Sequence, residues 1–256
     1  MRASADEQRR SAPGSPWLSA ALEATLRSPE PTIAGTPVGD PAADWLLGQS
    51  AALIVDLDGT LASAGLRRQL RLWREIGAEG RVLAHLGAAM AAARGRRHRD
   101  LDGFLAETMA RRASVPPHRA RRALTAVVDG AWPRAFAGAS VPPGLLRLLR
   151  AADRRGLVRA VWSDHPALDK LAAMGLGGWS VICAARPVGA LKPLPDAGWG
   201  LLAQLGVPPC RALLIGDRDD TDGAAAAALG CRFLRADAVE AALAPSRLRG
   251  LASRLV

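Results

Sequence analysis

The sequence predicts an α/β protein: a parallel sheet covered by helices on both faces, with a helical insert directly after the first strand. Three observations support this class. Short apolar runs alternate with helical segments from residue 51 onward, the strand pattern disappears between Leu61 and Ser140, and 49% of the 256 residues are hydrophobic. A chain of this length and composition can bury a large core.

Five apolar runs have the length and composition of buried strands. They span residues 51–56, 157–163, 179–184, 211–217 and 231–236. Helical segments lie between the later runs, and each ends at or near a glycine. These segments span residues 142–156, 166–177, 194–206 and 222–230. Strands that alternate with helices in this way form a parallel sheet with helices on both faces.

The insert has helical periodicity. Leu66, Leu70 and Trp73 are three or four residues apart, as on one face of a helix. Residues 101–112 and 116–128 predict two more helices. Ligands of an open α/β sheet bind outside the carboxyl ends of its strands. An insert at the end of the first strand is therefore expected to cover that edge as a lid.

The chain is expected to divide into three parts. Residues 1–44 mix Ser, Pro, Ala and Gly without sustained periodicity, which predicts a flexible N-terminal extension. Residues 45–65 and 138–256 form the predicted α/β core, and residues 66–137 form the predicted helical cap.

Composition narrows the class further. No stretch reaches 18 uncharged apolar residues, and no long apolar region follows the first basic residues, so neither a membrane span nor a secretory signal is expected. Cys183, Cys210 and Cys231 form no CxxC pair, which favours a reducing cytoplasm over a zinc site or a disulfide framework. Of the 34 basic residues only Lys170 and Lys192 are lysine, which suggests that lysine is kept where a compact ammonium is required.

The net charge of +10 is densest between residues 61 and 130, where 14 arginines stand against 6 acidic residues. Such a region could attract phosphorylated small molecules or nucleic acid. At least one of four arginines early in the insert is expected to face the substrate. These are Arg67, Arg68, Arg71 and Arg74.

Charged and hydroxyl side chains follow four of the predicted strands. They are Asp56 and Asp58, then Ser163, then Lys192, then Asp217. Because the carboxyl ends of parallel strands meet at one edge, these side chains are expected to converge. Two carboxylates so close together make each other harder to ionise, so a cation is expected beside them.

The order of these motifs resembles the haloacid dehalogenase superfamily of phosphatases and phosphotransferases. The motifs are DxDGT (56–60), a hydroxyl residue after the second strand, Lys-Pro (192–193) and GDxxxxD (216–222). The resemblance covers roughly residues 51 to 240 and implies a Rossmann-like three-layer αβα core. The insert resembles the α-helical (C1) cap subclass, which includes phosphoglycolate phosphatase-like and β-phosphoglucomutase-like enzymes.

Phosphate-ester chemistry gives these carboxylates a role. A divalent cation bound by Asp56 and Asp217 would offset the repulsion between an anionic nucleophile and a phosphate, and Mg²⁺ prefers oxygen ligands. The resemblance adds the backbone carbonyl of Asp58 as a metal ligand. Asp56 is the expected nucleophile, forming an aspartyl-phosphate. Asp58 is expected to protonate the leaving oxygen and then to activate water.

Other residues are expected to complete the site. Ser163 and Lys192 would bind the phosphoryl oxygens, and Lys192 would also balance the charge of the nucleophile. Gly59 permits the chain reversal after the first strand, and Thr60 is expected to fix that turn, with both beside the substrate phosphate. Asp222, by its family position, would be a supporting residue that holds the lysine or a metal-bound water.

The leading hypothesis is a Mg²⁺-dependent phosphatase of a phosphorylated small molecule. A phosphomutase uses the same motifs and stays open. The Asp58 carboxylate counts against a dehalogenase, whose members usually lack an acid at that position. A non-enzymatic binder of anions or nucleic acid is less expected, because aromatic residues make up only 4% of the chain and are not interleaved with the arginines.

Overall fold

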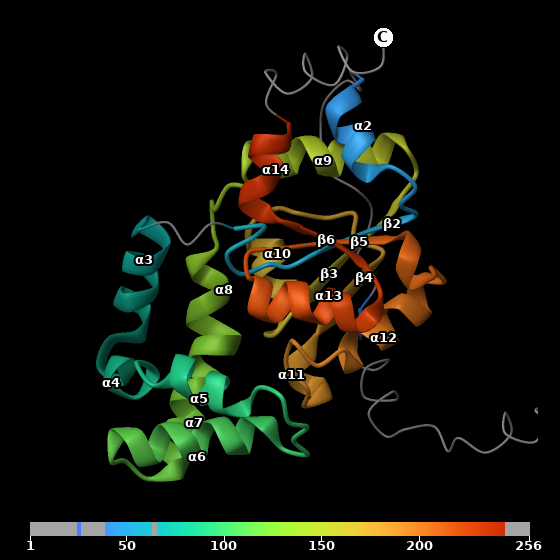
Figure 1. Cartoon of the computed structure of the whole chain (residues 1–256). Helices are drawn as coiled ribbons and strands as arrows, with labels where there is room; N and C mark the ends of the chain where they lie inside the picture. The colour runs from blue at the N-terminus through green and yellow to red at the C-terminus, as the bar shows by residue number, and fades with distance from the viewer. Residues whose placement is uncertain (1–24, 27–38, 63–65, 244–256) are drawn as a thin grey trace, which may run out of the picture.

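A six-stranded sheet forms the centre of the computed structural model, which describes residues 25–26, 39–62 and 66–243 (Figure 1). The strand order is β1-β4-β3-β2-β5-β6. The strands are β1 (Thr25–Leu26), β2 (Ala52–Val55), β3 (Val158–Ser163), β4 (Val181–Ala184), β5 (Ala212–Gly216) and β6 (Arg232–Arg235). Strands β2 to β6 pair in parallel, whereas β1 pairs with β4 in the antiparallel sense. The five predicted strands and their parallel arrangement are confirmed.

Helices cover both faces of this sheet, so the core has three layers (Figure 1). The first face packs against α2 (Pro41–Leu47), α9 (Pro143–Arg154), α10 (Leu168–Ala173) and α14 (Ala236–Ala242). The second face packs against α11 (Ala185–Val188), α12 (Asp196–Leu205) and α13 (Ala224–Leu229). Short helical turns lie at η3 (Pro209–Arg211) and η4 (Asp219–Gly223).

The central strand β2 shows why the sheet needs both layers. Leu53 and Val55 belong to the apolar cluster on the first face, and Ala52 and Ile54 belong to the cluster on the second. All four side chains are fully buried. Successive side chains of a strand point to opposite faces, so a strand that is apolar at every position requires cover on both.

The insert folds as a separate helical layer beside the core (Figure 1). It comprises α3 (Leu66–Ile76), η1 (Gly77–Glu79), α4 (Gly80–Leu83), α5 (Leu86–Ala93), α6 (Leu101–Ala113), α7 (Pro117–Ala126), η2 (Val127–Ala131) and α8 (Trp132–Ala135). It has an apolar cluster of its own, to which the core contributes Leu191. Asp100 fixes the start of α6, because its carboxylate accepts a hydrogen bond from the Gly103 amide at 2.8 Å.

The described residues of the segment before the core include a short strand and the start of a helix. The expected boundary at residue 44 falls inside α2, which begins at Pro41, and Thr25–Leu26 of the predicted extension form β1. The rest of residues 1–38 lies outside the described part of the chain. Within the described residues no helix is long and apolar enough to cross a membrane.

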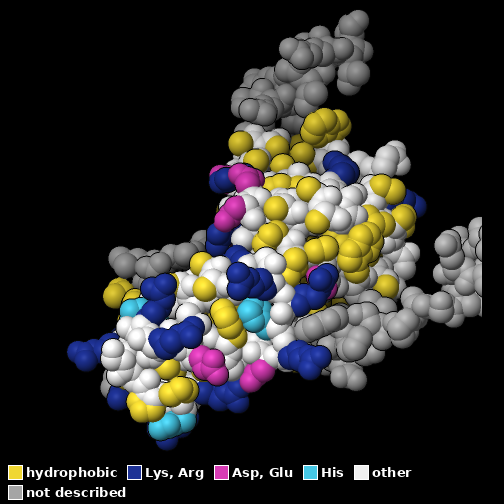
Figure 2. All heavy atoms as spheres, turned by 60° about the horizontal axis from the view of Figure 1, so that its bottom comes forward, with side chains coloured by type: hydrophobic (Ala, Val, Ile, Leu, Met, Phe, Trp, Pro, Cys, Tyr) yellow, Lys and Arg dark blue, Asp and Glu magenta, His cyan; other side chains and the backbone are white. Residues whose placement is uncertain are grey.

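Basic side chains on the face shown in Figure 2 lie in separate groups, with acidic side chains beside some of them. Many of the arginines are paired: Arg121 with Asp100 at 2.6 Å is one example on the cap. The positive charge on this face is therefore divided among several places.

Candidate active site

A cavity of about 170 Å³ lies between the cap and the edge of the sheet where β2, β3 and β5 end. It is lined by Asp56, Asp58, Met90, Arg94, Trp132, Ser163, Asp164, His165, Lys192, Asp217, Arg218, Thr221 and Asp222. The structure thus brings together Asp56, Asp58, Ser163, Lys192, Asp217 and Asp222 of the predicted site residues. Gly59 and Thr60 do not line this cavity.

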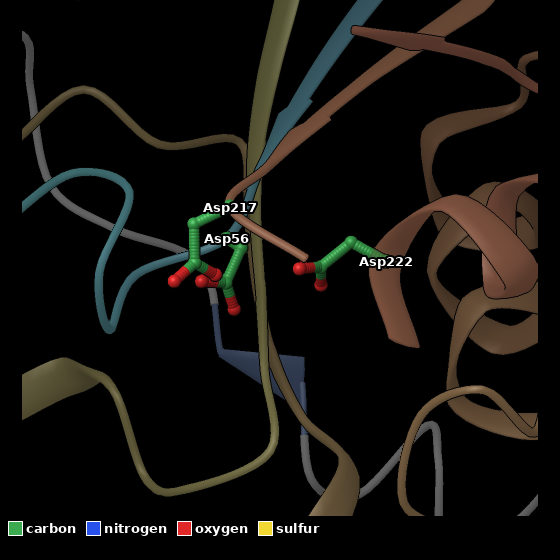
Figure 3. Close-up of side chains that lie close together, drawn as sticks. All are labelled: Asp56, Asp217 and Asp222. Atoms are coloured by element: carbon green, nitrogen blue, oxygen red, sulfur yellow. The ribbon is translucent and has the colours of Figure 1, made fainter. Parts of the chain in front are cut away.

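Three carboxylates converge at the centre of this site. Asp56, Asp217 and Asp222 each offer one oxygen, and these oxygens all lie within 4.8 Å of one another. Figure 3 shows the carboxylates of Asp56 and Asp217 side by side, with Asp222 pointing toward them from the neighbouring segment. The expected metal ligands were Asp56, Asp217 and Asp58 through its backbone carbonyl; the third carboxylate of the observed cluster is that of Asp222. Clustered hard oxygen donors fit a Mg²⁺ ion.

The electrostatics of the cluster favour a bound cation. Burial raises the pKa of Asp56 to about 7, and Lys192 opposes this rise while Asp222 adds to it. Partial burial and the neighbouring Asp222 also raise the pKa of Asp217 above its ordinary value. Both effects penalise the anionic forms, and a divalent cation placed among the oxygens would remove that penalty.

Lys192 is the cation of this cluster. Its side chain is 3% exposed, and Nζ donates hydrogen bonds to Asp56 Oδ1 at 2.7 Å and Asp222 Oδ1 at 2.5 Å. Nζ also donates to the Trp162 carbonyl at 3.2 Å. Burial lowers the pKa of Lys192, but Asp56 and Asp222 together raise it above its ordinary value. Lys192 is therefore charged and fixed between two carboxylates.

Asp58 has a different lysine as its partner. Lys170, on α10, is fully buried, and its Nζ donates to Asp58 Oδ2 at 2.7 Å. The ammonium also lies 4.1 Å from the ring centroid of Trp132 and 5.2 Å from that of Phe136. Sequence reasoning assigned no role to Lys170. The signal that could have found it is the scarcity of lysine, since both lysines of the chain bond to the aspartates of one motif.

Ser163, Gly59 and Thr60 make different contacts at the site. Ser163 Oγ donates a long hydrogen bond of 3.5 Å to Asp58 Oδ2 and accepts one from the His165 amide at 3.2 Å. Gly59 has φ +98°, and a Cβ added there would lie 2.3 Å from Asp217 Oδ2, so only glycine fits. The Thr60 hydroxyl is buried without a hydrogen-bond partner among the described residues, so nothing there fixes the turn through it.

Arg94, which follows α5, joins the cap to the core at the cavity. Its guanidinium pairs with Asp164 Oδ2 at 2.8 Å and donates a hydrogen bond to the backbone carbonyl of Lys192. Trp132 and Met90 contribute the apolar part of the cap lining. Sequence reasoning missed all three, because helical periodicity does not tell which face of a cap helix meets the core.

At least one of Arg67, Arg68, Arg71 and Arg74 was expected to face the substrate, and the structure describes the side chains of two of these four arginines. Arg71 donates to the Ala137 carbonyl within the cap, and Arg74 is exposed on α3; neither lines the cavity. The side chains of Arg67 and Arg68 lie outside the described residues.

Comparisons with known proteins agree with this arrangement. The model of the haloacid dehalogenase-like hydrolases matches residues 51–230, which is more than half of the chain. The chain belongs to the haloacid dehalogenase-like hydrolase family. The suspected superfamily is thereby confirmed, and membership makes the protein a hydrolase.

Solved structures share the fold of this family member. A 2-haloacid dehalogenase from Pseudomonas syringae pv. Tomato DC3000 has a TM-score of 0.50 at 17% identity, covering 72% of this chain and 85% of the other. A predicted phosphoglycolate phosphatase from Haemophilus somnus 129pt has a TM-score of 0.50 at 19% identity, covering 72% and 84%. Among curated proteins, no sequence matches this haloacid dehalogenase-like hydrolase.

Proposed function

We propose that this hydrolase is a Mg²⁺-dependent phosphatase that cleaves a small-molecule phosphomonoester through an aspartyl-phosphate on Asp56. The observation that carries the proposal is the convergence of Asp56, Asp217 and Asp222 within 4.8 Å beside the buried Lys192. Three carboxylates beside a single ammonium leave an excess of negative charge. A divalent cation would balance it and attract a phosphate.

The chain's residues then have distinct tasks. Asp56 and Asp217 would hold Mg²⁺ with their carboxylates, together with the Asp58 carbonyl that the family resemblance adds. A bound Mg²⁺ supplies charge neutralisation at the phosphoryl oxygens. Lys192 and Ser163 would orient those oxygens, and Asp222 holds Lys192 in place through its 2.5 Å hydrogen bond.

Two proton transfers complete the reaction. An Asp56 oxygen forms a bond to phosphorus as the ester P–O bond breaks, and the leaving oxygen takes a proton from Asp58. Asp58, now ionised, accepts a proton from water as that water attacks the phosphorus of the aspartyl-phosphate. The P–O bond to Asp56 breaks, inorganic phosphate leaves, and both carboxyl groups return to their first state.

A dehalogenase would have less use for this site. A halide leaves as a stable anion and needs no proton, so Asp58 would have no task. A haloacid also carries its own carboxylate, which three further carboxylates would repel. A phosphomutase needs the same residues as a phosphatase, and the product separates the two.

The substrate's leaving group is proposed to occupy a second cavity of about 510 Å³ that shares its lining with the first. Its walls are Leu86, Gly87, Met90, Ala91, Arg94, Trp132, His165, Arg218 and Asp220. Both arginines are already paired, Arg94 with Asp164 and Arg218 with Asp220. The lining residues that have no ion-pair partner are therefore largely apolar. This favours a leaving group with an apolar part over one that carries a strongly anionic group besides the phosphate.

A substrate screen tests this function. Phosphomonoesters should release inorganic phosphate with Mg²⁺, and excess EDTA should abolish release. Asp56→Asn should reduce activity to background without changing the circular dichroism spectrum. Conversion of a sugar phosphate to its isomer without free phosphate would favour the mutase. Halide release from 2-haloacids, full activity in EDTA, or full activity of Asp56→Asn would contradict the proposal.

A further inference from the structure

We propose that Lys170 is a positioning residue that holds the Asp58 carboxylate in place for proton transfer to and from the reacting oxygens. The inference rests on the proposed function and adds to it a residue outside the cavity. Lys170 does not line the cavity, so any effect it has on the reaction passes through Asp58.

The first argument is the cost of placing this ammonium where it lies. Lys170 is fully buried on α10, a helix whose other buried residues belong to the apolar cluster on the first face of the sheet. An ammonium taken out of water costs several kcal/mol, and this cost is offset only by good partners. Asp58 Oδ2 at 2.7 Å and the Trp132 ring at 4.1 Å are such partners.

The second argument is the direction of the bond. Lys170 approaches Asp58 from the helix that follows Ser163, and Ser163 Oγ contacts the same oxygen, Oδ2, at 3.5 Å. Two donors on one oxygen fix both the place and the rotation of a carboxylate. Asp58 is 23% exposed, so its carboxylate remains accessible from the cavity that it lines.

The third argument is the separation of the two lysines. Lys192 bonds to Asp56 and Asp222, whereas Lys170 bonds to Asp58. The nucleophile and the proton-transfer group are therefore each held by a cation of their own. Asp58 keeps its position independently of the charge changes at Asp56 as the aspartyl-phosphate forms and breaks.

Arg159 provides a matched comparison within the same fold. It is 2% exposed, pairs with Asp153 at 2.8 Å and lies 5.1 Å from the Trp179 ring centroid. This group repeats the chemistry of Lys170, Asp58 and Trp132: a buried cation, a carboxylate and an indole. None of its members lines the cavity. A purely structural role would make the two cations behave alike.

Phosphate esters differ in whether their leaving group needs a proton, and this difference reveals a defect in proton transfer. An alkyl phosphate has a strongly basic leaving oxygen that needs a proton as the ester bond breaks, whereas p-nitrophenolate leaves without one. Positioned proton donors contribute on the order of 10²–10⁴ in rate. A misplaced Asp58 should therefore slow phosphoryl transfer from the alkyl ester and spare the transfer from p-nitrophenyl phosphate.

The experiment measures kcat/KM for p-nitrophenyl phosphate and for an alkyl phosphate that the wild-type enzyme hydrolyses. Lys170→Met should lower kcat/KM for the alkyl ester about 100-fold, and that for p-nitrophenyl phosphate less than about 5-fold. With p-nitrophenyl phosphate, acid-quenched Lys170→Met should accumulate phosphorylated Asp56, seen by mass spectrometry, because water activation is also impaired. Arg159→Met should change both kcat/KM values alike and accumulate no phosphoenzyme.

A double-variant cycle decides whether Lys170 acts through Asp58. In an Asp58→Asn background, Lys170→Met should cause no further loss of kcat/KM for the alkyl ester. Lys170→Gln, which keeps a hydrogen-bond donor, should recover part of the alkyl-ester activity and provides the test if Lys170→Met does not fold.

Three results would overturn the inference: an equal loss on both esters, a further loss in the Asp58→Asn background, or failure of both Lys170 variants to fold while Arg159→Met folds. With an active wild-type enzyme, any of these leaves the proposed function standing. A wild-type enzyme that hydrolyses no phosphate ester overturns both.

Discussion

The two lysine sites of this protein place the same ion pair in different electrostatic settings. Lys192 lies between Asp56 and Asp222, with side chains 3%, 8% and 2% exposed. Lys170 meets the single carboxylate of Asp58, which is 23% exposed. The first site has more negative than positive charge even before Asp217 is counted, and the second is balanced.

This difference divides the cavity into two sides. The side of Asp56 has unbalanced negative charge and suits a cation with a phosphoryl group. The side of Asp58 offers one carboxyl group beside one ammonium and adjoins Trp132, so it has no excess of negative charge to attract a metal ion. The predictions below concern these two sides and the cap residue that lines the cavity.

The largest effect is expected from Lys192→Met. Two buried carboxylates would be left beside each other without their ammonium, so the free energy of unfolding should fall by about 3–5 kcal/mol. Phosphatase activity should be lost. Urea unfolding measures the first effect, and saturating Mg²⁺ should recover part of the lost stability by binding the folded state. Lys170→Met is the matched control. It should lower the free energy of unfolding by less, because water reaches the Asp58 carboxylate that it leaves unpaired. An equal cost for both variants would contradict the division of the cavity.

An intermediate effect is expected from pH at His165, which lies against the Trp132 ring at 4.5 Å on the Asp58 side. Burial, assisted by Lys170, lowers the pKa of His165 from 6.5 to about 4, against the opposing effect of Asp58 and Asp164. Arg186 lowers it further. The folded state therefore keeps His165 neutral, whereas the unfolded chain takes up a proton below pH 6.5.

The contribution of neutral His165 to the free energy of unfolding is fully present above pH 6.5 and is lost as the pH falls toward 4. The expected loss is about 2 kcal/mol between pH 8 and pH 5. Unfolding free energies of the wild type and of His165→Gln at these two pH values check it, since other titrating groups contribute equally to both proteins. The same pH dependence in both would show that His165 is accessible to protons in the folded state.

The smallest effect on stability is expected from Arg94→Ala. The Arg94–Asp164 pair joins the cap to the core and is partly exposed, so its removal should cost no more than about 1 kcal/mol. KM should nevertheless rise roughly 10-fold, because Arg94 lines the cavity and bonds to the Lys192 carbonyl.

Arg97→Ala is the matched control for this change. Arg97 also joins the cap to the core, through Asp196 at 2.6 Å, but does not line the cavity. It should leave KM unchanged. A similar rise in KM for both variants would mean that cap attachment in general, rather than Arg94 at the cavity, controls substrate binding.

Much of the fold follows from local patterns. Ala52–Val55 is apolar at every position, which predicts a strand covered on both faces and places Asp56 at the carboxyl edge of the sheet. The same reasoning places Ser163 and Asp217 at the ends of their strands. The cap was predictable as helical but not in its packing, and residues 127–131, η2, gave no separate signal.

The sequence by itself determined that carboxylates, a serine and a lysine meet at one edge of a parallel sheet, because strand direction and side-chain alternation are local properties. Only the tertiary structure decided which lysine bonds to which aspartate and that Arg94, not Arg71, faces the cavity. Such pairings depend on how α5 and α10 are rotated and docked. The total burial of apolar surface sets that rotation, and no single residue pattern encodes it.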